Sequence, residues 1–168
     1  MKNALAVDAP RSVPNWQEEN YAYRSCEKAA KAIDPGAGTF SGAAALYLRW
    51  FEIKPKLPRD CRVIETYPRV VWKRLNLPGT PKQLSLYRPQ VQAKLSKLVQ
   101  SPCDGFSSHQ IDAVLCAYVA FCYAAGRAEA LGTRGEGLIF VPAIDQMKRL
   151  PEDEDIKPCF RRFKPMGP

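Results

Sequence analysis

Strand-forming and helix-forming segments alternate along this chain of 168 residues, and this alternation constrains its fold more than any other feature. A short apolar run, ALAV at Ala4–Val7, ends at Asp8 and predicts a buried strand. The run CRVIETYP, rich in β-branched residues, predicts a second strand. Between them lie two helix-forming stretches, near 15–33 and 41–54. The pattern indicates an α/β architecture with a partly parallel sheet.

The second half of the chain predicts three more helices and a hairpin. RVVWKRLNL is a short helix, RPQVQAKLSKLVQ an amphipathic one, and SSHQIDAVLCAYVAF begins a long apolar helix over 108–125. Ser107 and Gln110 form a capping-box pattern at its start, and Gly126 follows its end as a left-handed cap. RAEALGTRGEGLIFVP then predicts two strands joined by a glycine-rich turn. We expect one domain over 1–142 and a loosely packed, charged tail over 143–168.

The composition is that of a folded protein, with 46% hydrophobic and 25% charged residues. No apolar run approaches the length of a membrane span, and the N-terminus does not resemble a signal peptide, so we expect a soluble cytoplasmic protein. The six cysteines are scattered without a C-x-x-C pair, which predicts free thiols and no structural zinc. The net charge of +8 favours polyanions, such as nucleic acid, or acidic surfaces as partners, and a basic protein without such a partner is the alternative.

Three carboxylates have a similar setting. Asp8 ends an apolar strand, Glu65 lies within VIETYP, and Asp112 enters the long apolar helix. Acidic groups at the border of a core need a compensating partner, and a divalent cation is an efficient one. An alternative for Asp112 is simply a favourable acidic group early in a capped helix. His109 is either a polar surface residue or a group that orients a carboxylate or a water.

The ordered set AVDAP, VIETYPRVVWKRL, SSHQIDAVLCAYVA, GRAEALG and GEGLIFVP resembles the family called domain of unknown function 429, which is regarded as a family of predicted nucleases. The resemblance covers Ala6 to Pro142. It implies an RNase H-like mixed sheet flanked by helices. The family's leading strand, which carries an aspartate, has no counterpart here. We therefore expect an N-terminally incomplete version of that fold, in keeping with the small number of predicted strands.

The resemblance also implies a chemistry. Asp8, Glu65 and Asp112 would hold Mg²⁺ or Mn²⁺, and the metals would promote phosphodiester hydrolysis. His109, the polar neighbour of Asp112, is a further catalytic candidate from its place in the sequence. Glu136 also matches an acidic position of the family, and it is the weakest of the four acidic candidates. The alternative is a catalytically inactive remnant or a nucleic-acid-binding protein of the same fold. A serine hydrolase is not indicated, because no G-x-S-x-G elbow occurs.

A nuclease also needs cations near its carboxylates to hold the phosphates that these groups repel. Several basic residues lie near the acidic segments, and each could instead line a solvated surface. The candidates for nucleic-acid binding are Arg11, Arg24, Arg69, Lys73 and Arg74.

Overall fold

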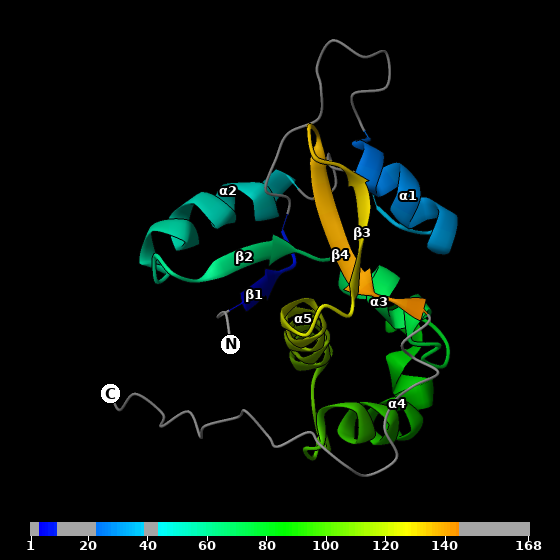
Figure 1. The fold of residues 1–168 in the computed structure, drawn as a ribbon. Coiled ribbons are helices and arrows are strands. Elements are labelled where there is room, and N and C mark those ends of the chain that lie inside the picture. Colours follow the sequence, from blue (N-terminus) through cyan, green and yellow to red (C-terminus); the bar gives the residue numbers. More distant parts are fainter. Residues whose placement is uncertain (1–3, 10–22, 39–43, 145–168) are drawn as a thin grey trace.

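The computed structural model describes residues 4–9, 23–38 and 44–144. The four strands among these residues form one mixed sheet with the order β1-β2-β4-β3 (Figure 1). The strands are β1 (Ala4–Val7), β2 (Arg62–Glu65), β3 (Ala128–Thr133) and β4 (Gly137–Pro142). β1 pairs in parallel with β2 and β2 with β4, whereas β3 is antiparallel to β4. The predicted α/β architecture, partly parallel sheet and C-terminal hairpin are confirmed.

Five α-helices accompany the sheet in the described part of the chain. They are α1 (Ser25–Ile33), α2 (Ala44–Ile53), α3 (Pro68–Arg74), α4 (Leu84–Val99) and α5 (Ser108–Ala124). The capping box of α5 is confirmed, because the Gln110 amide donates to the Ser107 hydroxyl at 3.3 Å and Gln110 Oε1 accepts from the Ser107 amide at 2.8 Å. No described helix is long and apolar enough to cross a membrane.

Two helix boundaries differ from expectation. α4 begins four residues before Arg88, because a short 3₁₀ turn at Pro81–Gln83 leads directly into it and Leu84 is buried in the core. The first helix runs only from Ser25 within the described residues, and the expected segment before residue 23 lies outside them. The expected tail, beyond Ile144, and the candidate Arg11 also lie outside the described residues.

Strand register shows which helix covers which face of the sheet. Glu65 pairs with Ile139, so their side chains share one face, and the neighbouring Phe140 points to the other. On that second face the rings of Phe140 and Tyr123 of α5 meet edge to face, with centroids 4.9 Å apart. Because Ala6 pairs with Ile64, which neighbours Glu65, Ala6 also faces α5.

The opposite face is covered by α1 and α3. Arg24, at the start of α1, donates to Glu65 of β2, and Arg74 of α3 forms an ion pair with Glu129 of β3 at 3.0 Å. Trp72 of α3 is 1% exposed, and its indole nitrogen donates to the Gly79 carbonyl at 3.2 Å. The two helix layers therefore enclose the sheet and place the start of α1 directly over the end of β2.

The middle of the sheet opens between β2 and β4. These strands are paired at a single position, Glu65 with Ile139, near the end of β2. Figure 1 shows β2 and β4 spreading apart from that point. The β1–β2 pair and the β3–β4 hairpin consequently bound a wedge-shaped space on one side of the junction.

Candidate functional site

Asp8 and Asp112 come together where β1 ends. Asp8 follows directly after β1, and Asp112 lies in the second turn of α5, the helix that packs on β1. Burial, the Asp112 carboxylate and the Glu65 carboxylate together raise the pKa of Asp8 to about 6. Burial also raises the pKa of Asp112, and the neighbouring His109 opposes this increase. The structure therefore brings two of the three predicted metal ligands into one crowded, negatively charged corner.

Cys116 lies one helical turn beyond Asp112 and faces the same corner. Burial, Asp8 and Asp112 raise the pKa of this thiol to about 12. At neutral pH the thiol is protonated, so it lacks the thiolate that a cysteine nucleophile requires. The five described cysteines are all free, as expected from their scattered spacing.

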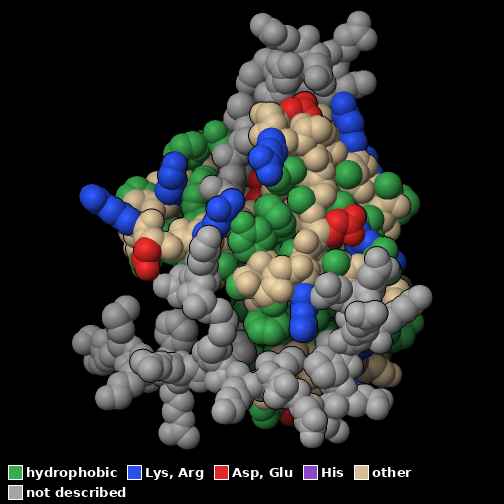
Figure 2. Space-filling model, viewed as in Figure 1, with side chains coloured by type: hydrophobic (Ala, Val, Ile, Leu, Met, Phe, Trp, Pro, Cys, Tyr) green, Lys and Arg blue, Asp and Glu red, His purple; other side chains and the backbone are tan. Residues whose placement is uncertain are grey.

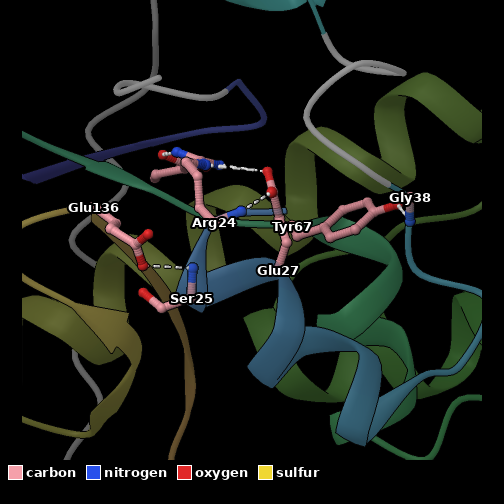
Figure 3. Close-up of polar contacts among 7 residues, drawn as sticks. Arg24, Ser25, Glu27, Gly38, Tyr67 and Glu136 are labelled. Atoms are coloured by element: carbon pink, nitrogen blue, oxygen red, sulfur yellow. Dashed lines mark hydrogen bonds and ion pairs between the residues drawn. The ribbon is translucent and has the colours of Figure 1, made fainter. Parts of the chain in front are cut away.

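Glu65 is held differently from the two aspartates. Its two carboxylate oxygens accept hydrogen bonds from Arg24 at 2.5 and 3.0 Å. Arg24 also donates to Glu27 Oε1 from Nε at 3.1 Å and from Nη2 at 2.9 Å, and the Arg24 amide donates to Glu27 Oε2 at 2.8 Å (Figure 3). All three side chains are buried, with Arg24 only 1% exposed. Glu65 is thus part of a buried ion network under α1.

This arrangement differs from the expected three-carboxylate metal site. No group of three His, Cys, Asp or Glu side chains suited to a metal ion occurs among the described residues. The physical reason is strand alternation, since Glu65 points toward α1 while the α5 helix that carries Asp112 covers the opposite face. Glu136 is also engaged elsewhere, because its carboxylate accepts from the Ser25 amide at 2.9 Å at the start of α1, which lowers its pKa (Figure 3).

The candidate cations fall into two groups. Arg24 is enclosed, and the Arg74 side chain is 8% exposed in its ion pair with Glu129, so neither guanidinium is presented to a ligand. Lys73 is exposed, and Arg69 is partly exposed while its Nε donates to Asp34 at 2.5 Å. Of the described candidates, Lys73 is therefore the most exposed, on a helix that begins at the carboxyl end of β2, whereas Arg69 is partly exposed and already bound to Asp34.

His109 is exposed in the first turn of α5. Its influence on the pKa of Asp112 shows that the two side chains are close. An imidazole at this place can orient or exchange a proton with a group bound at the two aspartates.

One cavity was not predicted from the sequence. It has a volume of about 810 Å³ and occupies the wedge between β2 and the β3–β4 hairpin. Its walls come from Arg62–Glu65 of β2, from the hairpin, and from Tyr123 of α5. We call it the β2–β4 groove. The polar and aromatic residues that line it belong to segments far apart in the chain, so no local sequence motif indicates the groove.

The chain matches no family model, no curated protein and no solved structure. The assignment of a function therefore depends on the geometry described above and on the motifs in the sequence.

The raised pKa of Asp8 predicts a stabilising effect of Asp8→Asn. The carboxyl pKa is about 6 in the folded protein and 3.8 in an unperturbed chain, so the folded state binds this proton more tightly. The stabilisation of the folded protein by protonated Asp8 is fully present below pH 4 and is lost as the pH rises through about 6. We expect Asp8→Asn to raise the melting temperature relative to the wild type at pH 7.5, with the difference disappearing at pH 4. Calorimetric melting curves across this range would test it, and an unchanged difference at the two pH values would contradict it.

Proposed function

We propose that this protein is a divalent-metal-dependent nuclease of the RNase H-like type, related to the domain of unknown function 429 family. The observation that carries the proposal is the pairing of Asp8 and Asp112 at the carboxyl end of the parallel strands. Two carboxylates held close and partly desolvated repel each other, and a bound cation would relieve that repulsion. Ligands of open α/β sheets commonly bind at this end of the strands.

The residues present fit one cation better than two. Mg²⁺ is often bound by only one or two carboxylates, with waters and substrate phosphate oxygens completing the octahedron. Asp8 and Asp112 provide that number. Glu65, with both oxygens accepting from Arg24, contributes negative charge near Asp8 without being a free ligand in this arrangement.

Each candidate residue has a defined role in this proposal. Asp8 and Asp112 would hold the ion and so fix the position of a bound phosphodiester. Lys73, exposed on α3, would attract a more distant phosphate of a bound strand. His109 would exchange a proton with the water or the leaving oxygen. The ion, when bound, would lower the pKa of a water and stabilise the leaving oxygen.

Calorimetric titration with Mn²⁺ tests the metal site. We expect binding to the wild type, and at least about tenfold weaker binding to Asp8→Asn and Asp112→Asn, because each variant removes one of the two charged ligands. Asp104→Asn, in the exposed turn before α5, is the matched control and should bind as the wild type does. Absence of binding to the wild type would overturn the proposal.

Cleavage assays on single-stranded and double-stranded DNA and RNA would then establish turnover, with Mg²⁺ or Mn²⁺ and with a chelator. A second function, nucleic-acid binding without catalysis, is favoured by one observation: Glu65 is neutralised by Arg24 instead of completing a three-carboxylate site. Metal binding and nucleic-acid binding without any cleavage would support this second function.

A further inference from the structure

The β2–β4 groove has the features of a ligand site. Its volume of about 810 Å³ is within the range of small-molecule and cofactor pockets. Hydrophobic side chains line the region between β2 and β4, and Lys and Arg side chains stand around it (Figure 2). The groove lies where β2 and β4 separate after their single paired position.

Two arginines define the charge of the groove. Arg62, at the start of β2, and Arg134, in the turn between β3 and β4, both line it and are both exposed. Glu65, at the inner end, is the acidic member of the lining, and its oxygens already accept from Arg24. The solvent-facing charge of the groove is therefore positive, which favours an anionic ligand.

Two aromatic rings define its apolar wall. Tyr123 and Phe140 line the groove and hold each other edge to face at 4.9 Å. The Arg62 guanidinium lies over the Tyr123 ring, 5.7 Å from its centroid. A guanidinium and an aromatic ring at this distance provide two groups on which a nucleobase can stack. An acidic peptide would use the arginines but would make no use of the aromatic ring.

We propose that the β2–β4 groove binds single-stranded nucleic acid, with one unpaired base stacked at Arg62 and Tyr123 and phosphates bound by Arg62 and Arg134. Stacking on side chains requires an unpaired base, which selects single strands over duplexes. This binding does not require catalysis.

The same groove would deepen the proposed nuclease function by naming its substrate. Asp112, Cys116 and Tyr123 lie on one stripe of α5, at spacings of four and seven residues. At 1.5 Å per residue, Asp112 and Tyr123 are separated by about 16 Å along the helix. A single strand anchored in the groove would have to span about this distance over the surface beside the stripe, because Val119 on the stripe itself is buried against the sheet. This step, unlike the binding itself, depends on the proposed function.

Fluorescence anisotropy with a short labelled oligothymidylate, in excess chelator to prevent cleavage, tests the groove on the full chain. We expect Arg62→Ala and Arg134→Ala each to weaken binding about fivefold or more and to reduce the slope of log K against log salt by about 0.7, as expected when one phosphate contact is lost. Tyr123→Leu should also weaken binding at least about fivefold through lost stacking, whereas Tyr123→Phe should retain it. Lys97→Ala, an exposed cation of α4, is the charge-matched control and should bind as the wild type does.

Three results would overturn the groove proposal. The first is no oligonucleotide binding by the wild type, and the second is equal binding by the wild type and both arginine variants. The third is displacement of the oligonucleotide by polyglutamate together with unchanged oligonucleotide binding by Tyr123→Leu. The last result would identify an acidic-peptide site. Because the assay contains no free metal, it is independent of the Mn²⁺ titration. Oligonucleotide binding by a wild type that binds no Mn²⁺ would contradict the metal site alone, and Mn²⁺ binding without oligonucleotide binding would contradict the groove alone.

Discussion

Arg24→Met is expected to destabilise the folded protein by about 3–5 kcal/mol, because it leaves two buried carboxylates without their common partner. Glu27 and Glu65 are each 4% exposed, and Arg24 donates to both. Methionine fills much of the same volume, so the loss measures the charge and the hydrogen bonds more than the packing. Removing one partner of a buried ion network costs far more than removing an exposed ion pair.

Urea unfolding followed by circular dichroism would measure this effect. Arg49→Met, an exposed position on α2, is the matched control and should change the free energy of unfolding by less than about 0.5 kcal/mol. If Arg24→Met does not fold, Arg24→Lys provides a milder test, because a lysine keeps the charge but cannot bind two carboxylates with a planar fork. Wild-type stability in both Arg24 variants would show that the network does not hold α1 on β2.

The elements that were predicted correctly are those with local signals. The strand β2 was marked by its β-branched residues, and α5 by its apolar length and by Ser107 and Gln110 at its start. The pairing of Asp8 with Asp112 follows from the same signals, because a strand stop and a helix start at one sheet edge bring the two side chains together.

The features that were not predicted depend on contacts between distant segments. Arg24 and Glu65 are 41 residues apart, and nothing in VIETYP indicates that its glutamate faces α1 instead of α5. A shift of one residue in strand register exchanges the two faces, so the sequence alone could not assign Glu65 to either. The β2–β4 groove is hidden for the same reason, since it exists only because the two strands separate after one paired position.

The close approach of α5 to β1 suggests a second large effect. Ala6 is 6% exposed on the strand face that α5 covers. Ala6→Phe would insert a ring between strand and helix, and overpacking of this kind costs about 1–3 kcal/mol. Because α5 would have to move away from β1, Asp112 would also move away from Asp8. We therefore expect the pKa of Asp8 to fall below its wild-type value of about 6 and Mn²⁺ binding to weaken.

Titration of the Asp8 carboxyl by NMR, together with urea unfolding, would test both consequences on one variant. Ala117→Phe, at an exposed position on the outer side of α5, is the control, because it adds the same ring without entering the strand–helix interface. A destabilised Ala6→Phe with an unchanged Asp8 pKa would show that the pKa depends on local burial and not on the distance to Asp112. A lowered pKa with weakened Mn²⁺ binding would instead show that the packing of one alanine sets the spacing of the two proposed metal ligands.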